Sequence, residues 1–450
     1  MKRTFCSRGW QGAYFSLVDS MSIVELGASI RISGGPYAFY RRAFGPLVGF
    51  LTGWTDWLAQ TATASFIAIV FAECVHRLGL LSKVPVSVVR TAILRVAPNM
   101  YNELSDANRA LRCVAQIPLR KETMKLRLLN GQDVRVLLPM DNCIDIMRKA
   151  MLLVAEERTL QPLRSSLWHP NGQGLLSMMP GYTADPHWLG IKVVSVFPGN
   201  FGTARGSHQG MVLLFEPASG SPVAIADGRE ITAIRTAAAT AVATDTLARS
   251  NAASLAILGY GEQACTHLQS LLIVRPFERI LVWGRDFAKA QQFCKRAALL
   301  IRSHVEAVRS VRAAVEAADV ICTTTASPEP VLEGKWLRSG QHLNVVGSSI
   351  PTTAEIDIDA VIRCRMFVDF KDSALELAGD FRRAREAGAI GEDHILGSLG
   401  DVLAGRIVGR TSDQDITMFK SLGMICEDLA AADFVLRESE RRGVGTLVEW

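Results

Sequence analysis

The C-terminal part of the chain alternates between short apolar runs and longer stretches with helical periodicity. Five of the apolar runs span residues 254–258, 279–283, 319–323, 342–346 and 366–369. Near-continuous apolar strands separated by helices are typical of a parallel sheet that is buried on both faces. The pattern therefore predicts an α/β domain from about residue 245 to residue 370.

A separate domain is expected to begin at residue 124. Met124–Leu129 has the composition of a short strand, and a helix is expected to begin near Met140, with Asp141 as its N-cap. The apolar face of this helix comprises Ile144, Met147, Met151 and Leu152. We assign residues 124–244 to this first domain.

The N-terminal third has a different pattern. Residues 43–72 form two uncharged runs broken only by Asp56, together long enough to span a bilayer. The first 123 residues carry 14 lysines and arginines against 7 aspartates and glutamates, whereas the rest of the chain carries 35 against 37. The basic net charge therefore belongs to the N-terminal third. No cluster of basic residues is interleaved with aromatic ones, which argues against nucleic-acid binding.

The nine cysteines are scattered along the chain, with no C-x-x-C pair and no His/Cys metal-binding spacing. This usage predicts reduced thiols in a cytoplasmic protein and no metal site.

The first apolar run ends in a G-x-G-x-x-A turn, Gly259–Ala264, that opens a helical stretch. Gly259 permits a tight turn, and Gly261 lets the backbone approach a pyrophosphate. The helix N-terminus, at Glu262 and Gln263, then faces the phosphates. Glycine pairs also occur in ordinary turns, but the strand before and the helix after this pair favour a dinucleotide-binding site.

The end of the second apolar run bears on the choice of dinucleotide. At this position a carboxylate binds a free ribose 2′-hydroxyl, whereas an arginine accommodates a 2′-phosphate. Arg285 precedes Asp286 here, which favours NADP(H) and leaves NAD(H) open. Alternatively, Arg285 is a solvated loop residue and Asp286 caps the helix that begins at Phe287.

Further cofactor contacts are expected after the next two runs. Thr324 and Ala326 follow the run at 319–323, at the carboxyl edge where cofactor contacts collect in open α/β sheets. Val346 and Ser349, at the end of the run at 342–346, are assigned to the same site.

Other motifs carry a resemblance to a known family. They are Gln161–Arg164, Met179–Tyr182, Gly190–Ser195, Ser207–Gly210, Glu230–Ala238, Asn344–Gly347 and Gly391–His394. With the glycine turn, they make residues 124–450 resemble the ornithine cyclodeaminase/mu-crystallin family over essentially the full length of its members. The resemblance implies a Rossmann-type domain, 245–370, inserted into an α+β substrate and dimerisation domain that residues 371–450 complete. It also implies a homodimer and a small imino- or amino-acid substrate.

A second resemblance concerns residues 10–80. Through Val24–Ala28, Ser33–Tyr37 and Arg41–Trp54, they resemble an early membrane-spanning portion of the amino-acid permeases. We expect residues 1–123 to be a permease remnant and linker in front of a soluble enzyme. A membrane-tethered enzyme, anchored through residues 43–72, is the alternative.

The family resemblance implies a set of substrate-binding residues. Arg164, Lys192 and Arg235 would line the pocket beside the nicotinamide and hold the substrate carboxylate, for which arginine offers a planar fork of donors. The ordinary alternatives are a lysine on the solvated face of a strand and, for Arg235, a structural ion pair. His208 is a candidate substrate-binding residue and proton relay, or a packed loop histidine.

The sequence departs from one branch of the family. In ornithine cyclodeaminases the strand equivalent to Asn344–Gly347 is followed by an aspartate and then a lysine, where this chain has Ser349 and Thr353. A serine hydroxyl cannot act as a carboxylate base at neutral pH. The resemblance thus favours an NAD(P)H-dependent reductase of ketimines like Δ1-pyrroline-2-carboxylate, with Lys192 and Ser349 as catalytic residues. Ornithine cyclodeaminase, an amino-acid dehydrogenase and a non-enzymatic mu-crystallin-like binding protein are the alternatives.

Overall fold

The computed structural model describes residues 124–200, 203, 205–299, 301 and 303–450. The permease-like segment and the apolar runs at 43–72 lie outside these residues. Within the described ranges, no helix combines the length and the apolar character needed to cross a membrane.

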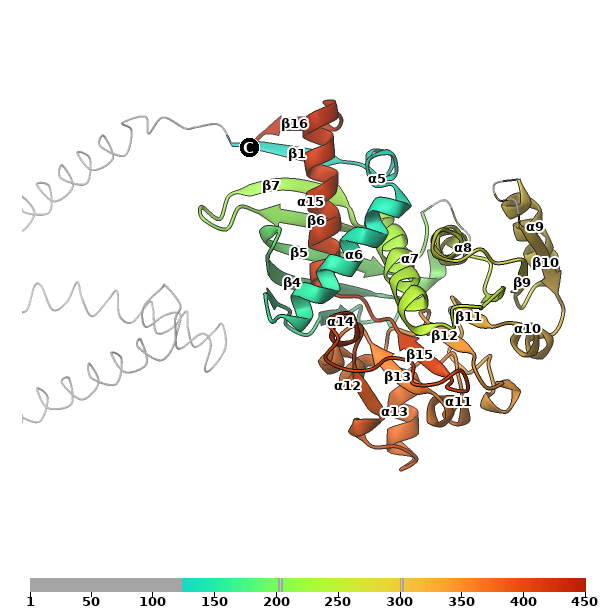
Figure 1. Ribbon diagram of the computed structural model, residues 1–450. Helices are drawn as coiled ribbons and strands as arrows, with labels where there is room; N and C mark the ends of the chain where they lie inside the picture. Colours follow the sequence, from blue (N-terminus) through green and yellow to red (C-terminus); the bar gives the residue numbers. More distant parts are fainter. Residues whose placement is uncertain (1–123, 201–202, 204, 300, 302) are drawn as a thin grey trace, which may run out of the picture. The chain divides into compact units, whose positions relative to one another are not determined.

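The first domain is an eight-stranded mixed sheet with helices on one face (Figure 1). Its strand order is β16-β1-β7-β6-β5-β4-β2, with β3 paired to β4. The strands are β1 (Lys125–Leu129), β2 (Thr159–Leu160), β3 (Ser165–Trp168), β4 (Leu175–Ala184), β5 (His187–Val196), β6 (His208–Phe215), β7 (Pro222–Asp227) and β16 (Thr446–Glu449). The helices are α5 (Gly131–Leu137), α6 (Met140–Ala155), η1 (Pro198–Asn200), α7 (Gly228–Leu247) and α15 (Ile425–Arg442).

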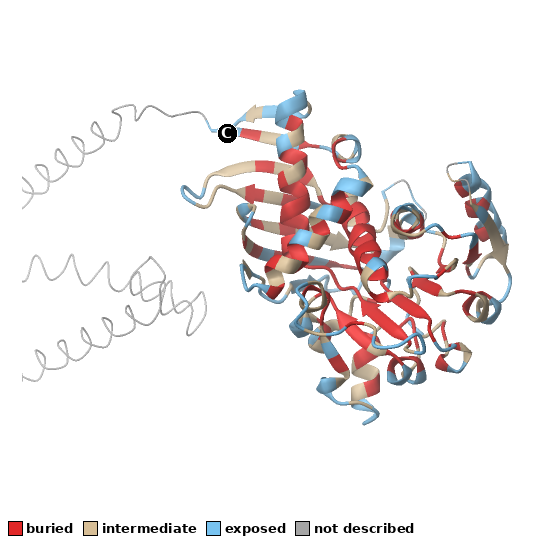
Figure 2. Cartoon of the chain, in the orientation of Figure 1, coloured by how far each residue is buried: buried red, intermediate tan, exposed pale blue. Residues whose placement is uncertain are grey.

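Strand β4 shows why the helices cover only one face of this sheet. Its residues alternate between buried and more exposed positions, as expected for a strand with one packed face. The buried face packs against α15, which also contacts β5 and β6. Helices α6 and α7 complete the same apolar core (Figure 2).

The predicted strand at 124–129 is confirmed as β1, but the expected N-cap of α6 is corrected. The helix begins at Met140 with Pro139 as its N-cap, so Asp141 lies in the first turn instead of capping it. An acidic residue in the first turn still complements the helix dipole. On the buried face, Leu153 takes the place expected for Leu152.

The second domain is an eight-stranded sheet whose neighbouring strands are all parallel, in the order β10-β9-β8-β11-β12-β15-β13-β14. The strands are β8 (Ser254–Leu258), β9 (Arg279–Trp283), β10 (His304–Val308), β11 (Val320–Thr323), β12 (His342–Val345), β13 (Arg365–Val368), β14 (Ile395–Ser398) and β15 (Thr417–Lys420). The helices are α8 (Glu262–Val274), α9 (Phe287–Ala298), α10 (Val311–Ala317), η2 (Gly334–Trp336), α11 (Ile358–Arg363), α12 (Lys371–Leu377), α13 (Gly379–Glu386), η3 (Glu392–His394) and α14 (Leu399–Leu403).

This sheet has the predicted Rossmann-type arrangement, since β10-β9-β8-β11-β12 follows the 3-2-1-4-5 order of that fold. Its strands separate two apolar cores (Figure 2). Strands β9 and β10 are added on one side of β8, whereas β11 and β12 are added on the other side, so the strand order reverses between β8 and β11. In open α/β sheets, ligands bind at such a switch point, beyond the carboxyl ends of the strands.

The predicted domain boundary at residue 370 is corrected. Strands β14 and β15 both follow residue 370 and belong to the second sheet, where β15 pairs with β12 and β13. Helix α15 and strand β16 return to the first domain, and α14 also packs against α6 of that domain. A four-residue strand that ends in a lysine gives little sequence signal, although all of β15 is buried.

Candidate active site

The glycine turn joins β8 to α8 at the switch point. Gly259 has φ +140°, and a Cβ there would lie 2.5 Å from the Thr324 hydroxyl oxygen, so only glycine suits the position. At Gly261 a Cβ would meet no described atom within 4 Å. Gly261 is also the N-cap of α8 and makes no side-chain capping bond. The turn therefore offers open space and unpaired N–H groups, which fits the pyrophosphate of a dinucleotide.

Alanine substitutions at the two glycines are expected to have different effects on cofactor binding and stability. Gly261→Ala should weaken NADPH binding about tenfold or more while leaving the melting temperature of the cofactor-free protein unchanged, because its methyl group enters only the phosphate space. Gly259→Ala should lower that melting temperature, because the strained turn costs about 1–3 kcal/mol. Fluorescence titration and thermal unfolding measure the pair. Equal cofactor affinity in Gly261→Ala and wild type would contradict the assignment.

The start of α8 is tied to the first domain. Glu262 forms an ion pair with Arg229 of α7 at 3.0 Å. The carbonyl of Gln263 is hydrogen-bonded to the His267 ring at 2.7 Å, and the Gln263 side-chain oxygen is buried without a partner among the described residues. The other nitrogen of the His267 ring is hydrogen-bonded to the Thr240 hydroxyl of α7 at 3.1 Å, so this bond and the ion pair hold α8 against α7.

At the tip of β9, Asp286 accepts a hydrogen bond from the Lys289 N–H at 3.1 Å and caps α9, so its capping role is confirmed. Arg285 is exposed beside it. A further cation, Arg309, follows β10 and stands 4.0 Å from the centre of the Phe287 ring. The sequence analysis missed Arg309, because β10 was not predicted.

The remaining predicted cofactor residues follow β11 and β12, at the same edge of the sheet. The Thr324 N–H donates to the Leu258 carbonyl at 2.9 Å, which joins the ends of β11 and β8. Ala326 is exposed, Val346 is buried and Ser349 is half-buried. The structure thus places these residues after β11 and β12, and Thr324 lies directly at the end of β8.

A buried carboxylate holds these loops in place. Glu355 is fully buried and accepts hydrogen bonds from the Thr323 hydroxyl, the Gly347 N–H and the Thr325 N–H, each at 2.6 Å. Burial raises the pKa of Glu355, and Lys420 opposes that effect. Sequence periodicity gave no signal for Glu355, whose partners come from two separate strands.

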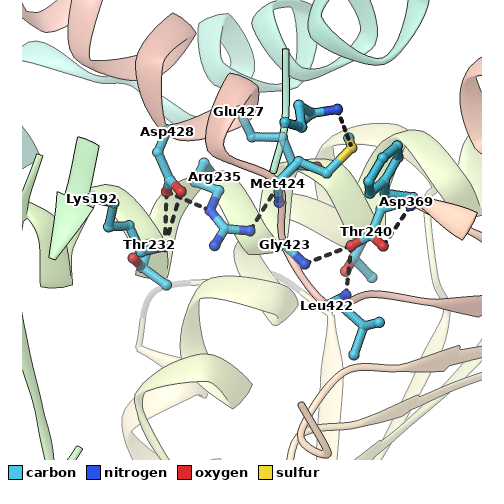
Figure 3. Close-up of polar contacts among 12 residues, drawn as sticks. Lys192, Thr232, Arg235, Thr240, Asp369, Leu422, Gly423, Met424, Glu427 and Asp428 are labelled. Atoms are coloured by element: carbon cyan, nitrogen blue, oxygen red, sulfur yellow. Dashed lines mark hydrogen bonds and ion pairs between the residues drawn. The ribbon is translucent and has the colours of Figure 1, made fainter. Parts of the chain in front are cut away.

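In the first domain, Lys192 and Arg235 meet at Asp428 of α15 (Figure 3). Lys192 lies on β5, and its Nζ stands 3.1 and 3.0 Å from the two carboxylate oxygens of Asp428. Arg235 lies on α7 and donates from Nε to Asp428 at 2.9 Å and from Nη1 to Glu427 at 2.8 Å. All four side chains are buried. Lys192 therefore faces the packed side of its sheet, and Arg235 forms the structural ion pair that was the alternative to substrate binding.

The electrostatics of this group bring the pKa values of Lys192 and Glu427 toward neutrality. Burial lowers the pKa of Lys192 to about 8, against the raising effect of Asp428. Burial would also lower the pKa of Arg235, but Asp428 and Glu427 outweigh it and raise the pKa. Burial raises the pKa of Glu427 to about 7, with Arg235 opposing. Lys192 can thus gain or lose a proton near physiological pH.

Arg164 joins the group through a backbone turn. It lies just before β3, and its Nη2 donates to the Leu422 carbonyl at 2.5 Å. Burial lowers the pKa of Arg164, and Asp369 opposes this effect. His208 begins β6 on the same face as Lys192, since Lys192 pairs with Val212 and His208 lies four residues before it. His208 is exposed, with its ring hydrogen-bonded to the Ser207 hydroxyl.

The carboxylates Asp369, Glu427 and Asp428 were missed by the sequence analysis. A signal existed for two of them, because Glu427 and Asp428 are the only charges in the apolar stretch Met424–Ala432. A charged pair inside a buried helix face indicates buried partners of opposite charge.

Comparison with known proteins is consistent with this site. Residues 124–442 match the ornithine cyclodeaminase/mu-crystallin family. A Δ1-pyrroline-2-carboxylate reductase of Bacillus cereus (strain ATCC 10987 / NRS 248) is 33% identical over 324 residues, which cover 72% of this chain and 99% of that protein. The ketimine reductase mu-crystallin of Mus musculus is 38% identical over 276 residues, 61% of this chain and 84% of that protein.

A solved structure is similar over the same region. The Δ1-pyrroline-2-carboxylate reductase of Thermococcus litoralis, in complex with NADH and L-proline, superposes with a TM-score of 0.70 at 34% identity. The match covers 71% of this chain and 99% of that one.

Proposed function

The chain belongs to the ornithine cyclodeaminase/mu-crystallin family, and we propose that it is an NAD(P)H-dependent reductase of imino acids that acts on ketimines like Δ1-pyrroline-2-carboxylate. The observation that carries the proposal is the meeting of Lys192, Arg235 and Arg164 around α15, in the domain that contacts the dinucleotide turn.

The two arginines suit a substrate carboxylate. Within the described part of the chain, Nη2 of Arg235 and Nη1 of Arg164 have no hydrogen-bond acceptor, although both side chains are fixed by other bonds. A guanidinium that is already oriented loses little conformational freedom when it binds a carboxylate. We assign carboxylate binding to these two residues, with the Lys192 ammonium beside them.

When bound, the reduced nicotinamide supplies the hydride that adds to the carbon of the C=N bond. Lys192 holds a proton near the substrate nitrogen and, with a pKa of about 8, can release it at neutral pH. The half-buried Ser349 hydroxyl relays protons at the edge of the site. Its neighbour Ser348 is fully engaged, because its hydroxyl contacts the Thr353 carbonyl at 2.5 Å.

Ser349 and Thr353 also favour reduction over cyclodeamination. They stand where ornithine cyclodeaminases have an aspartate and a lysine, and the Thr353 hydroxyl turns back toward the Ile350 carbonyl within its own loop. Neither side chain offers a base near neutrality.

The cofactor preference we propose is NADP(H). Arg285 and Arg309 are two cations near the tip of β9, whereas the Asp286 carboxylate is used to cap α9. Arg285→Ala should raise the KM for NADPH about 10- to 100-fold, because the variant loses a charge-assisted hydrogen bond to the 2′-phosphate. The KM for NADH should stay unchanged. The control is Lys295→Ala, at the far end of α9. Parallel changes in both KM values would contradict a 2′-phosphate contact.

We further propose a cytoplasmic homodimer that forms through the first sheet. Leu176, Leu189 and Met211 are 37%, 46% and 44% exposed on the face opposite the helices. An apolar sheet face of this kind is typical of a subunit interface. The cysteines in the described residues are free thiols, as suits a reducing compartment.

The function is tested by redox accounting. Purified protein with Δ1-pyrroline-2-carboxylate should consume one NADPH for each proline formed, measured by absorbance at the nicotinamide band and by amino-acid analysis. Incubation with L-ornithine should release no ammonia. Ammonia release from ornithine without net cofactor change would identify a cyclodeaminase instead, and cofactor binding without turnover of any ketimine would indicate a binding protein.

A further inference from the structure

A backbone turn between β15 and α15, Leu422–Met424, contacts both arginines that we assign to carboxylate binding. Figure 3 shows the turn beside Arg235 and Glu427. The Leu422 carbonyl accepts the hydrogen bond from Arg164. Gly423 packs against Arg235: its φ is +83°, and a Cβ there would lie 2.6 Å from Nη2. The Met424 N–H donates to Glu427, which also binds Arg235.

This turn is held by Asp369, which follows the neighbouring strand β13. One carboxylate oxygen of Asp369 accepts the N–H groups of Leu422 at 2.5 Å and Gly423 at 2.6 Å, and the other accepts the Phe370 N–H at 2.8 Å. Asp369 is 2% exposed. Within the described residues, all three of these bonds come from backbone N–H groups, so no side chain neutralises the carboxylate directly.

The charge of Asp369 nevertheless acts on both arginines. It opposes the effect of burial on the pKa of Arg164 and raises the pKa of Arg235. Burying a carboxylate that has no cation bonded to it is costly, and here the three backbone N–H donors and the nearby Arg235 charge offset that cost. Asp369 lies on the nucleotide-binding sheet, whereas the side chains of Arg164 and Arg235 come from the first domain.

We infer that Asp369 is a positioning residue that sets the spacing of Arg164 and Arg235 through the Leu422–Gly423 turn, and so couples the nucleotide-binding sheet to substrate carboxylate binding. The inference rests on the proposed function for the identity of the substrate. It concerns the affinity for a carboxylate and leaves the hydride-transfer chemistry to other residues.

The test separates KM from kcat. Asp369→Ala should raise the KM for Δ1-pyrroline-2-carboxylate on the order of 10- to 100-fold, because the groups that bind the carboxylate are slightly misplaced. The kcat and the Kd for NADPH should stay within about threefold of wild type. Asp369→Asn should recover part of the loss, because its amide oxygen can still accept from the turn. Asp372→Ala removes the same charge from an exposed position three residues away and should change nothing.

Gly423→Ala provides a second route to the same turn. Its methyl group would displace the Arg235 guanidinium, and its positive φ would also strain the turn that Asp369 holds. The variant should therefore show the same selective rise in KM together with a lower melting temperature. If Asp369→Ala fails to fold, this variant and Asp369→Asn decide the question. An unchanged KM, or a loss of NADPH affinity equal to the loss of substrate affinity, would overturn the positioning role.

Calorimetric titration of L-proline into protein saturated with NADPH distinguishes this inference from the proposed function. The Kd for L-proline should rise in the variants by the same factor as KM. If wild-type protein binds L-proline but reduces no ketimine, the proposed function fails while the proline affinities still judge Asp369. If wild-type protein binds no L-proline, the carboxylate-binding group itself is wrong.

Discussion

Lys192→Ala is expected to lower kcat with a ketimine substrate by about 10²- to 10⁴-fold, the range for loss of a general acid or base. The Nζ group is buried against the Asp428 carboxylate, which also binds Arg235, so no neighbouring lysine of the described chain can replace it. The Kd for NADPH should stay within about twofold of wild type, because Lys192 lies on β5 and the glycine turn lies in the other domain. Stopped-flow reduction and fluorescence titration measure the two quantities.

Two further variants separate charge from proton transfer. Lys192→Arg keeps a cation next to the substrate carboxylate but cannot release a proton at neutral pH, so KM should recover while kcat stays low. Lys149→Ala, an exposed lysine on α6, is the control and should match wild type. A Lys192→Ala enzyme with an unchanged rate would remove this residue from the active site.

Most strands of the second sheet could be predicted from the sequence. Strands β8 and β9 have the bounds that the apolar runs predicted, because each run forms one buried strand along its whole length. Strand β15 was missed because its four residues pack between β12 and β13, and only tertiary contacts select it. Strands β14 and β15 together move the domain boundary from residue 370 to the region of Lys420.

Of the charged residues of the site, only the cations could be predicted from the sequence. Lys192 and Arg235 were identified through a family resemblance, whereas their common partner Asp428 lies 236 and 193 residues away from them along the chain. Periodicity describes neighbours within one element and carries no information about such distant pairs. Asp369 illustrates the same limit, since its partners in the Leu422–Gly423 turn follow β15, 53 and 54 residues further along the chain.

Asp428→Asn is expected to have the largest effect on stability. Asp428 is fully buried and accepts from both Lys192 and Arg235, so an amide at this position leaves two buried cations with only Glu427 as a bonded carboxylate. Breaking a buried ion pair from one side costs about 3–5 kcal/mol. The free energy of unfolding in urea, without cofactor, measures the loss. Asp245→Asn removes a half-exposed partner of Arg148 and should cost about 1 kcal/mol or less.

The same variant should shift the pH dependence in a defined direction. Asp428 raises the pKa of Lys192 while burial lowers it, so removing the carboxylate should carry that pKa from about 8 to a lower value. If the ammonium form is the active one, the alkaline limb of kcat/KM moves to lower pH. The stability deficit of Asp428→Asn should shrink as pH rises through this interval, because a neutral Lys192 no longer needs the carboxylate. A pH profile and a stability equal to wild type would show that Asp428 does not control the charge of Lys192.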